Sequence, residues 1–570
     1  MSSIDQVPAS SEARRVPALF ARLLAEPNAI WMREMRQSAR LGRTPWVLFT
    51  LTVSISLLMC SIGGIATARD TSPANLGSAL FQVFFSLAYL VVVVVGPAVA
   101  ANSIASEREG RTWEAVLLTG LTPKEITRGK FLAAYTTIAL YIVILAPVGA
   151  LSFLFGGITA TEVIIAFFFL FLLAALCVAF GLAVSSLMSS LRGALVVTLI
   201  LAILIGPAAY AGFGFGCSFA VHELWNDVPV AHPIWLPLAY ARVPLGLDYV
   251  VLLVAVPLLL VLVPAWYLYE TTISNLAGPA DDRSSGIKRW FVFCTPLLAV
   301  AAAIPSIAAT ELHTRLIWAI WGLSLFGLHF GFCALLFGAE PPGPSRRVRV
   351  HWQREGAGFV RRFFGPGLLK TQVLAVLLGL FGMAFIAGVD ALWILRNPGS
   401  AAPKEVNNAV EQLTLFAADA MLYAVFVTGV IAWLRARSES AWTARLVACG
   451  VLFLVAAGPW VVATIGGALS DSRGQDWLLA GAPSPFYVVV MLQAVDNPPA
   501  TGIPPMLAGL GCAAAWAAIG ILLLGLAARR CRSIVSVHEA ALAQADAALA
   551  AEDAALTAGD PALAVGEAAS

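Results

Sequence analysis

Charge is scarce in this sequence, and the scarcity indicates the class of protein. Of the 570 residues only 12% are Asp, Glu, Lys or Arg, whereas 59% are hydrophobic and the mean hydropathy is +0.85. Soluble domains carry about 25% charged residues, so this composition excludes a soluble globular protein. The formal net charge of +2 also lacks the strong positive excess that is typical of nucleic-acid-binding proteins.

Several chemistry-bearing patterns are missing as well. The eight cysteines are scattered, most lie in apolar stretches and no CxxC pair occurs, which speaks against a disulfide or zinc framework. No G-x-x-x-x-G-K-[ST] phosphate-binding loop occurs, and "GKF" at 129–131 lacks the earlier glycine. The first 45 residues hold seven arginines and no apolar signal-peptide core, so we expect the first apolar segment to insert without cleavage.

What the sequence does contain is a series of long apolar segments. A bilayer core of about 30 Å requires about 20 apolar helical residues for each crossing. The sequence therefore predicts an all-α polytopic membrane protein with about twelve transmembrane helices. The predicted spans are residues 46–66, 79–101, 131–155, 162–187, 193–214, 247–269, 290–309, 315–338, 368–391, 412–434, 444–466 and 507–528.

The distribution of basic residues indicates the orientation of these spans. If the amino terminus is cytoplasmic, 29 of the 35 Lys and Arg residues lie in cytoplasmic segments and 6 lie outside. The opposite orientation would invert this bias, against the tendency of positive charge to remain inside. Both termini are therefore expected in the cytoplasm, with an even number of spans.

A dense polar island, ASEREGRTWEAVLLTGLTPKEITRGK at 105–130, separates the second and third spans. Each charge would cost about 2.5 to 3.5 kcal/mol at the bilayer centre, so the island must lie outside the membrane. On a helix, Glu107, Arg111 and Glu114 share one face. An apolar stripe on another face of the same predicted helix contains Trp113, Val116, Leu117 and Leu121.

The second part of the island predicts a turn and a new helix. Gly120 is placed to end the first helix. Thr122 is a candidate N-cap, Pro123 occupies the first helical position and Glu125 closes a capping box. The new helix continues through Lys130 into the third span. We interpret the island as a docking surface, with the tryptophan stripe on a partner and the charges setting the register, and a plain solvated connector is the alternative.

A second amphipathic segment, EPNAIWMREMRQSARLGRTPW, precedes the first span. Asn28 can cap a helix at the start of this segment. The predicted helix directs an apolar face towards lipid and a basic face towards lipid head groups. The apolar face holds Ile30, Trp31 and Met35, and the basic face holds Arg33, Arg36 and Arg40.

The stretch EREGRTWEAVLLTGLTPKEITRGKFLA resembles the signature loop of the type-2 ABC transporter permeases, in which an E-R-E-x-G/R-T-x-E helix precedes T-P-x-S/T-x-x-E-I-x-x-G-K. The segment before the first span resembles the interfacial helix of the same family, N-P-x-x-x-R-E-x-R, on Trp31, Arg33, Glu34 and Arg36. The resemblance implies that residues 103–121 form a coupling helix that docks on a separate ATPase dimer. The docking residues implied are Glu107, Arg108, Glu109, Arg111, Trp113, Glu114, Val116 and Leu117.

The same resemblance implies the activity of the whole assembly. ATP and Mg are bound and hydrolysed by the partner ATPase subunit, so this chain needs no cofactor of its own and is not by itself an enzyme. The expected function is export by alternating access in the bacterial cytoplasmic membrane. Few fixed charges line the first six spans, which favours an amphipathic or lipid-like cargo.

Members of this family usually have six spans, so the resemblance also divides the chain. The predicted parts are a cytosolic interfacial helix at 1–45, a permease domain at 46–280, a second membrane region at 281–532 and an Ala-rich acidic tail at 533–570, helical to about 557. The loop compared with the coupling loop, RARSESAWTAR at 435–445, has no second capped helix. The second region is either a degenerate permease half, giving an internal pseudo-dimer, or an added domain on a permease that pairs with a second copy. The single convincing docking loop favours the added domain.

Two other functional classes are open alternatives. A secondary carrier of major-facilitator type has a short D-R-x-G-R-R turn between spans two and three, where this chain has about thirty residues. Such carriers also bury ionisable residues in mid-membrane. A membrane-embedded enzyme would use the outer segment 217–235, with a metal on His222, Glu223, Asp227 and His232. Their spacing fits no known ligand frame, and Trp225 and Trp235 fit interfacial anchors better.

Isolated polar residues and one basic loop occur in the second half. Asp390 and Asp419 lie near the outer ends of spans nine and ten, where pairing with polar groups of the bundle is one explanation and exposure of the helix end to water is the simpler one. His329 lies within a span, so we expect it to hydrogen-bond to a neighbouring helix. The loop at 339–367 is basic with interleaved aromatic residues, which predicts attraction to anionic lipid.

Overall fold

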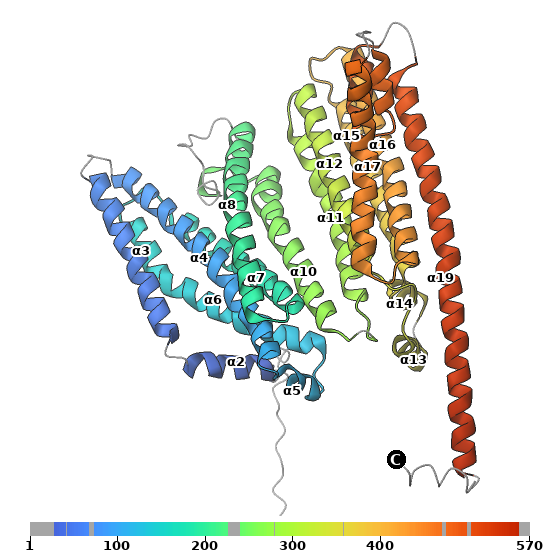
Figure 1. The fold of residues 1–570 in the computed structure, drawn as a ribbon. Coiled ribbons are helices and arrows are strands. Elements are labelled where there is room, and N and C mark those ends of the chain that lie inside the picture. Colours follow the sequence, from blue (N-terminus) through green and yellow to red (C-terminus); the bar gives the residue numbers. More distant parts are fainter. Residues whose placement is uncertain are drawn as a thin grey trace, which may run out of the picture. The chain divides into compact units, whose positions relative to one another are not determined.

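The computed structural model describes residues 28–40, 43–67, 73–225, 240–278, 280–356, 358–469, 475–498 and 503–557. These residues are mainly helical and include no strand, which confirms the predicted all-α membrane fold. The chain divides into two compact units, Met1–Leu276 (unit 1) and Ala277–Ser570 (unit 2). Most of the long helices of each unit are labelled in Figure 1.

Unit 1 is a bundle centred on one long helix. Its elements are α2 (Ala29–Arg40), α3 (Arg43–Thr67), α4 (Pro73–Glu109), α5 (Trp113–Leu118), α6 (Pro123–Leu154), α7 (Ala160–Leu187), α8 (Leu191–Leu224) and η1 (Tyr249–Ala255) continuing into α10 (Val256–Leu276). The central helix α4 packs on α3, α6, α7 and α8. Figure 1 shows α2 and α5 together at one end of the unit.

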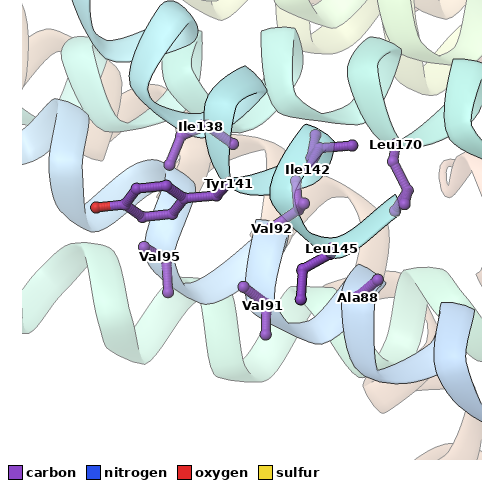
Figure 2. Close-up of a pocket in the computed structure, with 9 residues that line it drawn as sticks. All are labelled: Ala88, Val91, Val92, Val95, Ile138, Tyr141, Ile142, Leu145 and Leu170. Carbon is purple, nitrogen blue, oxygen red and sulfur yellow. The ribbon is translucent and has the colours of Figure 1, made fainter. Parts of the chain in front are cut away.

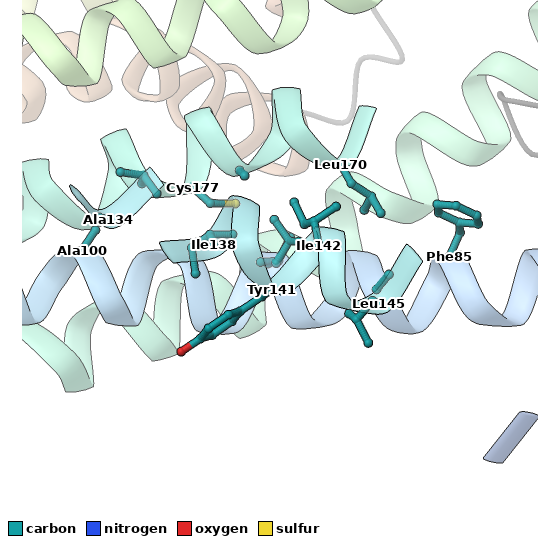
Figure 3. Close-up of a cluster of buried hydrophobic side chains, with 14 of the residues drawn as sticks. Phe85, Ala100, Ala134, Ile138, Tyr141, Ile142, Leu145, Leu170 and Cys177 are labelled. Atoms are coloured by element: carbon teal, nitrogen blue, oxygen red, sulfur yellow. The ribbon is translucent and has the colours of Figure 1, made fainter. Parts of the chain in front are cut away.

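The core of unit 1 is an apolar cluster between α4, α6 and α7. Figure 3 shows part of this cluster, including Phe85, Ile138, Ile142 and Leu170, all of which are buried. Aliphatic and aromatic side chains fill the contacts between these helices, so the bundle interior offers no charged group at this level. The end that carries α2 and α5 is polar instead, and the candidate functional site lies there.

Unit 2 is a second bundle of long helices. Its elements are α11 (Ser285–Ala308), α12 (Leu312–Phe337), α13 (Arg346–Arg354), α14 (Phe359–Phe364), α15 (Leu368–Arg396), α16 (Pro403–Arg437), α17 (Ala441–Leu469), η2 (Gln475–Gly481), η3 (Pro485–Tyr487), α18 (Val488–Asp496) and α19 (Pro505–Thr557). Helix α16 packs most closely on α19, where a Cβ on Gly429 would lie 2.3 Å from the Gly520 carbonyl oxygen. Glycine thus permits backbone-to-backbone packing between these helices.

Eleven helices among the described residues are long and apolar enough to cross a membrane. The first predicted span corresponds to α3, whose apolar part within the described side chains is the shorter segment Phe49–Ile65. Each of the twelve predicted spans therefore coincides with an observed helix, if η1 and α10 are counted together. Most helices extend beyond the apolar segments, because capped polar turns continue the helix past the hydrophobic stretch.

Of the two predictions for isolated polar residues in unit 2, one is confirmed and the other is wrong. His329 Nε2 lies 3.2 Å from Thr295 Oγ1, so the expected hydrogen bond to a neighbouring helix is present. The proposed exposure of Asp390 and Asp419 to water is wrong, because both side chains are buried. Packing of adjacent helices covers the ends of these spans, and hydropathy along the sequence does not report that packing.

Candidate functional site

The polar island does not form the single helix predicted over 103–121, because α4 ends at Glu109. The amides of Arg111 and Thr112 donate to the carbonyls of Arg108 and Glu107 at 3.2 and 2.9 Å. This is a Schellman-type helix end, with Arg111 in the left-handed region at a φ of 56°. Glu107, Arg111 and Glu114 therefore do not share a helix face. Glycine usually takes the left-handed position at such a helix end, but here the glycine is residue 110, one position earlier. The sequence therefore did not reveal that the helix ends at Glu109.

The second part of the loop follows the prediction closely. Gly120 has a φ of 74°, a left-handed conformation that glycine adopts without strain, and it follows Thr119, the C-cap of α5. The Glu125 amide donates to Thr122 Oγ1 at 3.3 Å and the Thr122 amide donates to Glu125 Oε2 at 2.8 Å. Pro123 begins α6. The capping box and the helix through Lys130 are thus confirmed.

The faces of α5 are arranged differently from the predicted stripe. Val116 is buried, and Trp113 and Leu121 are partly buried against the core of unit 1. The Arg108 guanidinium lies 5.6 Å from the centre of the Trp113 ring. Trp113 therefore packs on its own unit. The large apolar side chains that point outward are Leu117 and Leu118, which are 47% and 87% exposed.

The reason for this arrangement is geometric. Val116, Leu117 and Leu118 are consecutive, and neighbouring helical positions differ by about 100° around the helix axis. Three successive apolar residues cannot all face the core. Leu118, which the sequence interpretation omitted, is the most exposed of them.

Two of the charged side chains in the E-R-E motif connect the loop to the turn between α7 and α8. Arg108 donates to the carbonyl oxygens of Ser186 and Met188 at 2.8 and 3.2 Å. Glu109 Oε2 accepts a hydrogen bond from the Leu191 amide at 2.7 Å, at the start of α8. These bonds hold the end of α4 against the neighbouring helices. The exposed charges that remain on the loop are Arg111 and Glu114.

Glu107 belongs to a closed cluster of four charges between α2, α4 and α6. The fully buried Lys130 ammonium lies 2.9 Å from Glu107 Oε2 and 3.1 Å from Glu34 Oε1. Arg33 forms ion pairs with both carboxylates, and Lys130 also donates to the Ser103 carbonyl at 2.9 Å. Two positive and two negative groups balance each other. Burial works to lower the pKa of Arg33, but the carboxylates of Glu107 and Glu34 outweigh it and the pKa is raised.

The amino end of α2 is seated directly on α6. Asn28 Oδ1 accepts from the amides of Ile30 and Trp31 at 3.0 and 3.3 Å, which confirms the predicted N-cap. Asn28 Nδ2 also donates to the Glu125 carbonyl at 2.9 Å, so the cap links two helices. Ile30 is buried, so its predicted position facing lipid is wrong. Trp31 and Met35 are partly buried and Arg36 is exposed.

Gly129 permits this contact and provides a direct test of it. A Cβ at residue 129 would lie 2.3 Å from Asn28 Oδ1 and 2.7 Å from the Ile30 Cβ. Gly129→Ala should therefore displace α2, at a cost of about 1–3 kcal/mol for overpacking. We expect trypsin to cleave the arginine-rich helix at least about fivefold faster in this variant.

The matched control for this substitution is Gly450→Ala. Gly450 also lies inside a helix, and a Cβ there meets nothing within 4 Å. Both substitutions raise helix propensity by about 1 kcal/mol. Equal cleavage rates in the two variants would mean that the close seating of α2 on α6 is not required.

One turn before the loop, a side chain of α7 enters the backbone of α4. The buried Ser185 hydroxyl accepts from the Ala105 amide at 2.9 Å and donates to the Ala101 carbonyl at 2.6 Å. These two groups would normally bond to each other in a helix. Insertion of a side chain into a helical ladder is a known origin of bending. α7 is therefore tied to the backbone of α4 one turn before the loop.

The interior of unit 1 contains a small apolar cavity between α4, α6 and α7, shown in Figure 2. Its lining residues are Ala88, Val91, Val92, Val95, Ile138, Tyr141, Ile142, Leu145 and Leu170. No charged side chain lines it, and its room corresponds to about one water molecule. This cavity is a packing gap in the bundle and is too small to hold a cargo molecule.

The side chains of the candidate metal ligands in the outer segment lie outside the described part of the chain. Asp227, His232 and Trp235 lie outside the described residues, as do the side chains of His222 and Glu223. Among the residues that are described, no group of three His, Cys, Asp or Glu side chains could hold a metal ion. Trp225 is partly buried.

Sequence reasoning missed several residues of the site. Ser103 acts through its backbone carbonyl and Ser185 through its hydroxyl, and no local sequence pattern marks either residue. Gly129 and Leu118 left clearer signals in the sequence. A glycine inside a predicted helix suggests that another segment packs closely on it. Three successive apolar residues on a helix imply that at least one of their side chains points away from the core.

Comparison with known proteins identifies the segment that contains this site. Residues 64–229 match the model of a family described as "ABC-2 family transporter protein". The match begins near the end of α3 and includes the complete loop around α5. No curated protein matches the chain.

Proposed function

We propose that the chain is a permease of the type-2 ABC transporter family, on the basis of the match at residues 64–229, and that the loop around α5 docks on a separate ATPase subunit. The chain is a multi-pass membrane protein and a transport subunit. In the proposed assembly the ATPase binds ATP and Mg, and this chain carries the path for the cargo. The distribution of basic residues supports a cytoplasmic position for α2 and α5.

The observation that supports the docking role most directly is the outer face of α5. Leu117 and Leu118 are exposed beside Arg111 and Glu114, on a loop whose other large side chains pack inward. Exposed apolar side chains with charged neighbours are the usual composition of a small protein interface. The docking face is therefore Arg111, Glu114, Leu117 and Leu118. Glu107, Arg108, Trp113 and Val116 support it from behind.

The supports of the loop suggest how a movement of the ATPase reaches the spans. The four-charge cluster joins α2, α4 and α6, and Arg108 and Ser185 connect α4 to α7. A displacement of α5 would therefore move the ends of these helices together. We propose that closure of the ATPase dimer on ATP shifts this end of unit 1 and reorients the bundle, as alternating access requires.

The proposed direction is export across the bacterial cytoplasmic membrane. The core contacts of unit 1 consist of aliphatic and aromatic side chains. A strongly charged cargo would be poorly solvated along such helices. This supports an amphipathic or lipid-like cargo.

The test of this function is purification of the full chain from its native membrane in a mild detergent. We expect a second chain with a G-x-x-x-x-G-K-[ST] motif to co-purify, identified by mass spectrometry, together with ATP hydrolysis that orthovanadate inhibits. Transport by the purified chain alone, driven by an ion gradient and unaffected by ATP, would overturn the proposal in favour of a secondary carrier.

A further inference from the structure

Unit 2 repeats the order of elements seen in unit 1. In unit 1 the six long helices are α3, α4, α6, α7, α8 and η1 with α10, and in unit 2 they are α11, α12, α15, α16, α17 and α19. In both units short helices occur between the second and third long helices, α5 in unit 1 and α13 with α14 in unit 2. In both units a three-residue turn joins the fourth and fifth long helices, at 188–190 and 438–440.

The packing of the long helices is repeated as well. We number the six long helices of each unit by their order in the chain. Eight pairs of helices are then in contact in both units. These pairs are 1–2, 1–3, 2–3, 2–4, 3–4, 3–6, 4–5 and 4–6. The contact between α4 and α8 has no equally extensive counterpart in unit 2. Such agreement is not expected for an unrelated set of six helices, which can pack in many ways. The family match ends at residue 229 and does not cover unit 2.

The turns between the fourth and fifth helices agree in detail. Ser190 Oγ accepts from the Gly193 amide at 3.2 Å, and Ser440 Oγ accepts from the Thr443 amide at 3.4 Å. Both serines therefore cap the start of a fifth helix. The segment 435–445 was compared above with the coupling loop. Its position in the packing order is that of the turn at 188–190, so that comparison is corrected here.

The counterpart of α5 in unit 2 is α14. Both helices have six residues and are followed closely by the third long helix of their unit. Each also exposes two adjacent apolar side chains. These are Leu117 and Leu118 in α5, and Phe359 and Val360 in α14, of which the last two are 82% and 66% exposed.

The loop that carries α14 is firmly supported from within unit 2. Val348 and Trp352 of α13 are buried, and a Cβ on Gly365 would lie 2.1 Å from the Trp352 ring. The fully buried Lys288 donates to the Gly365 carbonyl at 2.7 Å. The exposed pair on α14 therefore projects from a braced segment, as the pair on α5 does.

The basic character of this loop is largely neutralised by acidic partners. The ion pairs are Arg346 with Asp546, Arg347 with Asp281, Arg349 with Glu539 and Arg361 with Glu355. Two of these acidic residues belong to the part of α19 that follows the last predicted span. Charges that are already paired contribute little to attraction by anionic lipid. The structure therefore favours a protein partner over a lipid surface.

We propose that α14 and its flanking residues form a second docking site for the ATPase, so that one chain carries two docking loops, one in each unit. This inference rests on the proposed function of the α5 loop. The occupant is a second ATPase subunit of the same kind, since an equivalent element in the same packing order presents an equivalent apolar pair. Arg354 and Arg362 have no ion pair among the described residues, so an acidic rim on the occupant would complement them.

The test uses the full chain in its native host with the photo-crosslinking amino acid p-benzoyl-phenylalanine. The crosslinker replaces Leu118, Phe359 or, as the matched control, the exposed Glu439 in the turn at 438–440. We expect adducts at positions 118 and 359 with a chain that carries the G-x-x-x-x-G-K-[ST] motif, and none at 439. The native mass of the purified complex should correspond to one copy of this chain with two ATPase subunits.

The other outcomes separate this inference from the proposed function. An ATPase adduct at 118 without one at 359 would overturn the inference and leave the proposed function intact. Lipid adducts alone at 359, or an ATPase adduct at 439 in place of 359, would also overturn it. Absence of ATPase adducts at all three positions would contradict both proposals.

Discussion

Leu118→Asp is expected to weaken association of the chain with its ATPase by at least about thirtyfold, which corresponds to about 2 kcal/mol. Leu118 is the most exposed large apolar residue of α5, at 87%. The substitution removes apolar contact area and places an unpaired carboxylate where the docking site would be desolvated. Because the side chain makes no part of the core of unit 1, the fold should be unaffected. Affinity is measured by titrating detergent-purified chain with the purified ATPase.

Two variants control this experiment. Leu118→Met keeps an apolar side chain of similar volume and should retain binding to within about threefold. Leu154→Asp introduces the same charge on an exposed leucine at the far end of α6, away from the loop. It should bind normally. Normal binding by Leu118→Asp would remove the outer face of α5 from the interface, whereas equal losses in both Asp variants would indicate a general effect of charge.

Lys130→Met is expected to cause the largest loss of stability. Lys130 is fully buried between two carboxylates, and removal of one partner from a buried ion pair commonly costs about 3–5 kcal/mol. Arg33 alone would then face Glu34 and Glu107, which leaves one negative charge uncompensated. We expect a lower midpoint of thermal unfolding in detergent and faster proteolysis of α2.

A double-mutant cycle distinguishes a charge imbalance from a simple packing defect. Glu107→Gln combined with Lys130→Met restores neutrality, because Arg33 then pairs with Glu34 alone. The double variant should be more stable than Lys130→Met by itself. If the two single losses simply add, the charges do not act as a cluster, and transmission through α2, α4 and α6 loses its support.

Local features of the site were determined by the sequence alone. The cap at Asn28, the capping box of Thr122 and Glu125 and the end of α5 before Gly120 follow from residues within a few positions of each other. The spans were equally readable, since hydrocarbon requires long apolar helices whatever the surrounding fold. The break after Glu109 is the local exception, because Arg111 takes the left-handed position that glycine usually occupies.

Which side of each element is buried was decided only by the tertiary structure. Trp113 and Ile30 pack inward, and Asp390 is covered, because helices distant in sequence meet there. Glu107 could not be assigned to Lys130 and Arg33 from spacing, since the three residues lie on three helices. The repeated plan of unit 2 is likewise a pattern of contacts between helices. Such contacts depend on packing across the bundle, and hydropathy and helical spacing report only the preferences of single segments.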